Sequence, residues 1–307
     1  MRIRSLAPPD WDQLAELIYS SLSVWYRTRL NMEKFGAEAE PFRVFPELYE
    51  ALDPGCCVVA EDEASGRLAG SIFYHPRETH WAVGIVNTNP DFGGRGVARA
   101  LMQHVLALAD AAGKPVRLVS SAMNLDSFSL YTRLGFVPCM TFQDLKLEVP
   151  AAGMPPVGES GLMLRRALPE DAERIADFEL RLNGIRRSHD WRHFIRNEQQ
   201  CWHLWIAERA DGSLAGFLGA VAHPASQMVG PGVCEDESAA IVLLHRVLDE
   251  TFRGRGVVWL APVHCAALVR QCYAWGARNV ELHLASVHGA APPMKGITFP
   301  TFMPETG

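Results

Sequence analysis

The sequence has no excess of positive charge and no long hydrophobic run. Its 307 residues include 29 Lys and Arg against 35 Asp and Glu, which gives a formal net charge of −6 at pH 7. Because nucleic-acid phosphates attract basic surfaces, this charge argues against a nucleic-acid partner. No apolar stretch reaches the length of about 20 residues that a membrane-spanning helix needs. We therefore expect neither a nucleic-acid partner nor a membrane partner.

Paired cysteines are also lacking. The seven cysteines are an odd number, two of them are neighbours at Cys56 and Cys57, and none form a CxxC pair. This pattern does not indicate a disulfide framework or a zinc site, so we expect reduced, buried thiols and no bound metal. The first residues, Met-Arg-Ile-Arg, run directly into polar residues and do not resemble a signal peptide. These features predict a cytoplasmic protein.

A glycine-rich turn between a strand pattern and a helix pattern is the most informative feature of the chain. The apolar run Trp81–Val86 leads into the turn, which reads Asn89-Pro-Asp-Phe-Gly-Gly-Arg-Gly-Val-Ala-Arg-Ala-Leu101. Apolar residues then recur at helical spacing, up to Leu108. The first N–H groups of a helix have no partner within the helix, and the helix dipole adds positive charge there. Such a turn can bind phosphate oxygens.

Two other phosphate-binding motifs do not fit this turn. In the dinucleotide fingerprint G-x-G-x-x-G a small residue is needed where Arg99 stands, and the Gly-Lys-Ser/Thr of a Walker A loop is absent. A tight strand-to-helix turn that binds no ligand is the alternative interpretation of this segment.

A second segment, further along the chain, supports the interpretation of this turn as a phosphate-binding loop. After the apolar strand candidate 116–122, the chain reads Asn124-Leu-Asp-Ser-Phe-Ser-Leu-Tyr131-Thr-Arg-Leu-Gly135-Phe136. The two segments together resemble the GCN5-related N-acetyltransferases (GNAT). The family's phosphate loop, Arg/Gln-x-x-Gly-x-Gly/Ala, corresponds to residues 93–98, and its second motif of Asn, Tyr and Gly-Phe corresponds to residues 124–136. Gly93 departs from the family, which usually has Arg or Gln there.

The resemblance implies acetyl-CoA as co-substrate and a set of residues that bind it. The pantetheine arm would pair with the backbone of Val86, Asn87 and Thr88, as an added strand does. Asn124 would hold the pantetheine amide. The pyrophosphate would bind the backbone of Gly94, Arg95, Gly96, Val97, Ala98 and Arg99.

The resemblance also implies the chemistry, in which a neutral amine attacks the thioester directly. Main-chain N–H groups near Val86 could stabilise the oxyanion. Tyr131 is the expected general acid, because a phenol with a pKa near 10 stays protonated at pH 7 and can protonate the leaving thiolate. A core position for Tyr131 is the alternative. Many family members have a basic carboxylate where this chain has Val119, which leaves Glu78, His80 or water as the general base.

The sequence has a linker-like segment near its middle, and the pattern before this segment is repeated after it. Residues 149–161 are rich in Pro and Gly and predict a linker between domains at 1–148 and 162–307. The segment 58–70 resembles 204–216, with a hairpin pattern in each. We expect an α/β (α+β) fold of two tandem GNAT-like domains, each with a twisted, mixed but mostly antiparallel sheet flanked by helices.

The second copy lacks the residues that would bind the cofactor. We place Met228–Val233 at its loop position, followed by Cys-Glu-Asp-Glu-Ser, and Pro231 supplies no N–H donor. The carboxylates there would repel a phosphate. Cys265 and Cys272 stand where the first copy has Asn and Tyr. We therefore expect a degenerate second copy that serves as a structural partner.

These observations predict an acyltransferase. It would move an acetyl group from acetyl-CoA to a primary amine of a small-molecule acceptor, by direct attack in a ternary complex. A non-catalytic acyl-CoA-binding sensor or interaction module is the alternative. The acceptor, the acyl chain length and the oligomeric state are left open, and a homodimer is one of the options.

Overall fold

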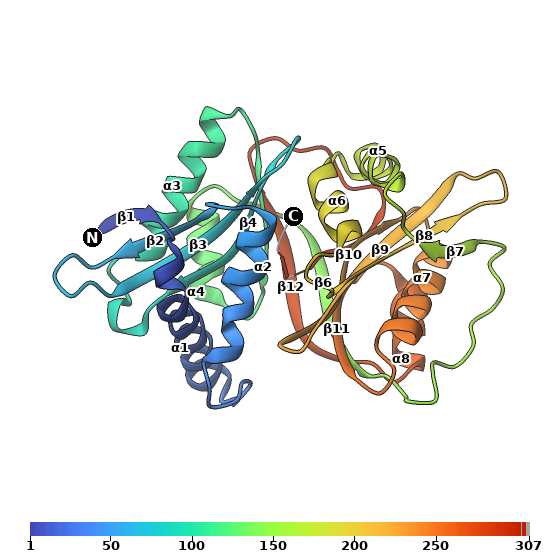
Figure 1. Ribbon diagram of the computed structural model, residues 1–307, viewed down its shortest axis with the longest axis horizontal. Helices are drawn as coiled ribbons and strands as arrows, with labels where there is room; N and C mark the ends of the chain where they lie inside the picture. Colours follow the sequence, from blue (N-terminus) through green and yellow to red (C-terminus); the bar gives the residue numbers. More distant parts are fainter. Residues whose placement is uncertain (302, 305–307) are drawn as a thin grey trace. The chain divides into compact units, whose positions relative to one another are not determined.

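The chain folds into two compact units (Figure 1). The structure is a computed structural model that describes residues 1–301 together with residues 303 and 304. The first unit consists mainly of Met1–Pro76 and Trp81–Val116, and the second of Arg77–His80 and residues 117–301. The domains predicted from the sequence, 1–148 and 162–307, are repeated segments rather than these compact units, and their bounds stay a prediction. Phe302 and residues 305–307, which end the second predicted domain, lie outside the described residues.

The first unit is built on antiparallel strands. They lie side by side in the order β1 (Arg2–Ser5), β2 (Cys57–Glu61), β3 (Leu68–Pro76) and β4 (Trp81–Thr88). The connections include short 3-10 helices, namely η1 (Pro8–Asp10), η2 (Glu40–Arg43) and η3 (Pro90–Phe92).

Helices cover both faces of these strands (Figure 1). They are α1 (Trp11–Leu30), α2 (Val44–Leu52) and α3 (Val97–Ala111). Phe73 of β3 lies with its ring 4.6 Å from that of Tyr49 in α2. Gly70 of β3 points to the other face, where an added Cβ would lie 2.6 Å from Val97 of α3. The alternation along one strand thus separates α2 from α3.

The second unit contains the remaining strands. They lie in the order β5 (Val116–Ser121), β12 (Arg278–His288), β6 (Val137–Glu148), β11 (Gly256–Pro262), β10 (Ser226–Cys234), β9 (Leu214–His223), β8 (Trp202–Glu208) and β7 (Met163–Arg166). The pairing of β10 with β11 is parallel, and a short strand, β13 (Ile297–Phe299), pairs with β10 outside this order. The mixed, mostly antiparallel sheet that the sequence predicts is confirmed.

The two halves of the sequence exchange strands. In sequence β6 precedes the segment 149–161, yet it pairs with β11, where Leu145 lies opposite Trp259. On its other side β6 pairs with β12, where Thr141 lies opposite Leu284. In Figure 1 the green β6 accordingly runs between the red β12 and the orange β11. The compact units therefore differ from the halves of the sequence, and the sequence analysis did not predict this exchange.

Helices also cover both faces of the second unit. They are α4 (Leu125–Arg133), α5 (Asp171–Asn183), α6 (Ser188–Arg196), α7 (Glu237–Thr251) and α8 (Ala266–Ala274). Phe217 of β9 packs its ring 4.8 Å from Trp191 in α6, whereas its neighbour Leu218 belongs to the buried cluster that contains Leu244 and Val247 of α7. Burying a side chain of this size stabilises the fold by roughly 1.5–3 kcal/mol. No helix in the described part of the chain is both long and apolar enough to cross a membrane.

Candidate functional site

The strand predicted to bind the pantetheine arm, β4, contains a bulge. Between the pairs Ile72–Val86 and Tyr74–Val83, β4 has one residue more than β3, and the extra residue falls at Gly84–Ile85. A bulge bends its strand and increases the local twist, and bulges are frequent next to ligand sites. The predicted pantetheine residues Val86, Asn87 and Thr88 follow directly.

Close packing fixes the helix that follows β4 against the strands. A Cβ at Gly70 would lie 2.7 Å from the carbonyl oxygen of Asn87 and 2.6 Å from Cγ1 of Val97. Only glycine fits at this crossing without a shift of the backbone. The start of α3 is therefore held close to the end of β4.

The predicted phosphate loop is an exposed turn at the start of α3. Gly94 and Gly96 have φ angles of 73° and 78°, a region that favours glycine. A Cβ at either position would meet open space, so the turn is not buried beneath other atoms. The first helical bond joins the N–H of Ala100 to the carbonyl of Gly96. The three preceding N–H groups, at residues 97–99, therefore have no acceptor within the helix.

The charges around this turn favour an anion. The first turn of α3 holds no acidic residue, and Arg95 and Arg99 are exposed. The carboxylate of Asp91 is paired with Arg67 at 2.7 Å, which offsets its repulsion of a phosphate. The helix dipole adds positive charge at the same end. The predicted loop residues 94–99 thus lie together in and directly after this exposed turn.

Asn124 and Tyr131 lie in the second unit, on α4. Asn124 is the N-cap of this helix, and its side-chain oxygen accepts a hydrogen bond of 3.1 Å from the N–H of Ser127. This bond points the amide nitrogen of Asn124 away from the cap, as a donor for a ligand carbonyl. Tyr131 is buried and packs its ring 5.9 Å from that of Phe136. The contact fits a core position for the ring.

The two side chains considered for the general base anchor the turn 77–80. Glu78 accepts hydrogen bonds from the backbone N–H and the hydroxyl of Ser188. Burial raises the pKa of Glu78, but these bonds and the charge of Arg186 outweigh it and lower the pKa, which makes Glu78 a weaker base. His80 is buried, with Nδ1 3.2 Å from the hydroxyl of Thr79. These contacts favour structural roles for Glu78 and His80.

The second unit repeats the strand-and-bulge arrangement. Between the pairs Val229–Ala220 and Gly232–Leu218, β10 has one residue more than β9. Our placement of Met228–Val233 at a loop position is therefore wrong, because these residues lie within β10. Its Gly-Pro-Gly sequence resembles a turn but forms a bulge.

The start of α7 differs from that of α3. The turn before it consists of acidic residues, and the carboxylate of Asp236 accepts a hydrogen bond of 2.8 Å from the N–H of Ala239. Glu237 adds a second carboxylate in the first turn. Asp236 thus occupies a donor that a phosphate would need, and both charges oppose an anion.

The chain's own β13 covers the edge of β10 that follows the bulge. Gly232, Val233 and Cys234 pair with β13 in antiparallel register. Thr88 of β4 lies opposite Gly70, and Cys234 of β10 lies opposite the corresponding glycine, Gly216. Thr88 and Cys234 are therefore equivalent positions. It follows that the residues of β10 paired with β13 are equivalent to the residues of β4 that are predicted to bind pantetheine.

A buried asparagine holds β13 in place. Asn183 of α5 donates a hydrogen bond of 2.8 Å to the hydroxyl of Thr298 and accepts one of 3.0 Å from the N–H of Gly296. The sequence analysis missed these residues. The short apolar run Ile297–Phe299 was the available signal, but a run of this length does not reveal its partner strand.

The helix α8 also corresponds to α4. Cys265 is the N-cap of α8 with φ −83° and ψ 80°, close to the −87° and 80° of Asn124. Cys265 makes no side-chain cap bond, however, and Cys272 is fully buried. Burial raises the pKa of Cys272 to about 12, so its thiol stays protonated.

The comparisons with known proteins agree with these features. Residues 16–136 match the model of the acetyltransferase (GNAT) family. The matched segment holds both the glycine turn and the Asn124–Tyr131 motif. No curated protein matches the chain in sequence.

Solved structures extend the likeness to nearly the whole chain. A tandem GNAT protein from the clavulanic acid biosynthesis pathway has a TM-score of 0.60 at 17% identity, over 94% of this chain and 98% of that one. A GCN5-related N-acetyltransferase from Sphaerobacter thermophilus gives 0.63 at 17%, over 95% and 96%. A presumed acetyltransferase from Pyrococcus horikoshii gives 0.70 at 15%, over 98% and 95%. At such identities the shared property is the fold, and the predicted tandem GNAT fold is confirmed.

Proposed function

We propose that this chain is an N-acetyltransferase that transfers the acetyl group of acetyl-CoA to a primary amine of a small-molecule acceptor. The observation that carries the proposal is the exposed, cationic glycine turn that follows a bulged strand. Both elements have the form that a CoA diphosphate and a pantetheine arm require. All seven cysteines are free thiols, which fits the cytoplasmic location that we propose.

Each predicted residue has a defined task in this proposal. The backbone of Val86, Asn87 and Thr88 pairs with the pantetheine arm, and the turn residues 94–99 bind the diphosphate. Asn124 donates its amide N–H to the pantetheine, while its oxygen keeps the helix capped. Tyr131 protonates the thiolate of CoA as the amine attacks the thioester carbon. With Glu78 bound to Ser188, water takes the proton of the amine.

We propose that only the first copy binds acetyl-CoA and that the second is degenerate. The β13 pairing supports this proposal, since backbone groups that already serve one strand cannot pair with a ligand. The carboxylates of Asp236 and Glu237 support it independently, because they oppose an anion at the start of α7. The second copy then has a structural role, because its strands β11 and β12 pair with β6 of the first copy.

A matched pair of substitutions tests the phosphate turn. Gly94→Glu places a carboxylate among the proposed diphosphate donors, and we expect it to weaken acetyl-CoA binding by about 100-fold. Gly212→Glu is the control, since Gly212 has a φ of 80°, also faces open space and lies in the hairpin between β8 and β9. Calorimetric titration of both variants gives the two affinities. An equal loss in both variants would trace the effect to backbone strain and refute the phosphate site.

An acyl-CoA-binding sensor without turnover is the second candidate function. Gly93 and Val119 favour it, because each stands where many family members have a functional side chain. A thiol-release assay with acetyl-CoA and a panel of primary amines separates the two candidates. Release of CoA with at least one amine supports the enzyme, whereas binding without release by any amine supports the sensor.

A further inference from the structure

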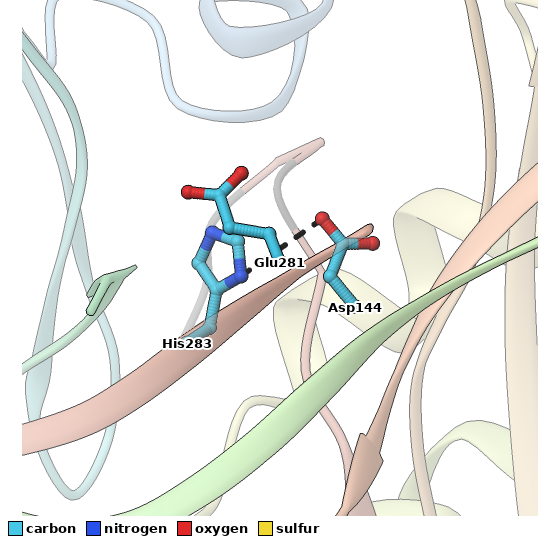
Figure 2. Close-up of side chains that lie close together, drawn as sticks. All are labelled: Asp144, Glu281 and His283. Carbon is cyan, nitrogen blue, oxygen red and sulfur yellow. Dashed lines mark ion pairs between the residues drawn. The ribbon is translucent and has the colours of Figure 1, made fainter. Parts of the chain in front are cut away.

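Two carboxylates and an imidazole meet where β6 pairs with β12. Asp144 lies on β6, and Glu281 and His283 lie on β12. Each offers a ligand atom, and these atoms all lie within 4.8 Å of one another. Figure 2 shows the carboxylate of Glu281 above the imidazole and that of Asp144 beside it. The exposed fractions are 4%, 5% and 7%, so all three side chains are buried.

The strand register explains why these side chains converge. Asp144 is the cross-strand partner of Glu281, and His283 follows two positions along the same strand and so points to the same face. Leu145, the neighbour of Asp144, points to the opposite face and belongs to the core cluster beneath α7. The three polar side chains are thus held together by two strands from different halves of the sequence.

The arrangement brings like charges together in a buried place. Carboxylates directly opposite each other on neighbouring strands repel, and burial increases the repulsion because little water screens it. Two ionised carboxylates would bring a charge of −2 to this place, of which a protonated His283 in its ion pair with Asp144 would offset one unit. A divalent cation would balance this charge, and the imidazole would supply a neutral ligand.

The distance between two of these groups is close to that between two ligands of one metal ion. Nδ1 of His283 lies 3.9 Å from Oδ2 of Asp144, which is longer than a hydrogen bond. Two ligand atoms on a tetrahedral zinc ion, each bonded at about 2.0–2.1 Å, lie about 3.3 Å apart. A shift of roughly half an ångström would therefore bring this pair to ligand spacing.

We propose that Asp144, Glu281 and His283 bind one divalent transition-metal ion, for which Zn²⁺ is the best match. An imidazole nitrogen with two carboxylate oxygens suits zinc, whereas Mg²⁺ and Ca²⁺ prefer oxygen ligands alone. Three protein ligands leave a fourth position for water or a substrate group. Because the ligands come from both exchanged strands, binding stabilises the pairing of β6 with β12. The expectation of no metal depended on cysteine spacing, and it is replaced by this proposal.

The first test measures zinc binding to the whole chain after removal of metal with a chelator. We expect one Zn²⁺ per chain by calorimetry and a higher melting temperature with Zn²⁺ than with the chelator. Asp144→Asn, Glu281→Gln and His283→Gln should each weaken binding by about 100-fold or more, since even partners behind the ligands change metal affinity by about 10–100-fold. Glu148→Gln and His264→Gln, which alter exposed side chains of the same types, should bind as the wild type does.

The second test needs no variant and locates the metal directly. Co²⁺ bound at this site should show ligand-field absorption without a thiolate charge-transfer band, which excludes the seven cysteines as ligands. Anomalous scattering from a zinc-soaked crystal should peak among the three side chains. The proposal is overturned if the wild type binds no zinc, if the peak lies elsewhere, or if Zn²⁺ and chelator leave the melting temperature equal. These readouts do not involve acetyl transfer, so they are independent of the proposed enzyme activity.

Discussion

The starts of α3 and α7 follow the same local architecture and differ in what they can bind. Both helices follow a bulged strand, and both pack against a glycine of the neighbouring strand, Gly70 or Gly216. The turn before α3 is open and cationic, whereas that before α7 is acidic and capped by Asp236. Packing residues are thus alike in the two places, while a few turn residues set the charge that an anion would meet there.

The strands β4 and β10 also differ in how their backbone groups are used. In β10, the residues after the bulge are paired with β13. A strand edge can serve a ligand or a segment of its own chain, because each N–H and C=O group forms one such pairing.

Removal of the proposed general acid should have the largest effect. Tyr131→Phe keeps the ring contact with Phe136 and deletes the hydroxyl, so we expect kcat to fall by about 10²–10⁴-fold with little change in acetyl-CoA affinity. Cys272→Ala makes the corresponding change in the second copy and should leave kcat unchanged. Steady-state kinetics with a thiol-detecting reagent measure both. An unchanged kcat in Tyr131→Phe would assign Tyr131 to the core alone.

Substitution of Gly70 or Gly216 should have similar effects on stability and different effects on acetyl-CoA binding. Gly70→Ala and Gly216→Ala each force a Cβ to within 3 Å of neighbouring atoms. Each should lower the free energy of unfolding by about 1–3 kcal/mol. Only Gly70→Ala should also weaken acetyl-CoA binding, because it displaces the start of α3. Denaturant titration and calorimetry test the two expectations, and a similar loss of binding in Gly216→Ala would contradict the assignment of one site.

Loss of the buried anchor should loosen β13. Asn183→Ala leaves Thr298 and the N–H of Gly296 without their partner in α5, and we expect a destabilisation of about 1–3 kcal/mol. Hydrogen exchange at residues 297–299 should accelerate. The stoichiometry of acetyl-CoA should stay at one, since the acidic turn before α7 persists. A second bound molecule would show that β13 alone closes the second copy.

The smallest effect concerns the two residues that begin α4 and α8. Asn124→Ser keeps a capping oxygen but removes the amide donor, so stability should hold while acetyl-CoA affinity falls by about 5–10-fold, the value of one hydrogen bond. Cys265→Ser is the matched change in α8 and should leave affinity unchanged. Thermal melts and calorimetry of the two variants provide the measurements. Equal affinities in both variants would remove Asn124 from the site.

The sequence predicts local features of this molecule well and non-local ones poorly. The glycine turn before α3 could be predicted because its glycines, its helix pattern and its preceding strand are adjacent in the chain. For the bulge in β10 the sequence predicts a loop instead, since Gly-Pro-Gly is typical of turns. The exchange of β6, the pairing of β13 and the meeting of Asp144 with Glu281 depend on backbone hydrogen bonds between distant segments. Such bonds leave no pattern in residue spacing, which is why the structure was needed to find them.

Calorimetric titration of the purified chain with acetyl-CoA decides whether the chain has one cofactor site. We expect one molecule bound per chain in the wild type, with affinity lost in Gly94→Glu and retained in Gly212→Glu. Absence of binding, or two equivalent sites per chain, would contradict it.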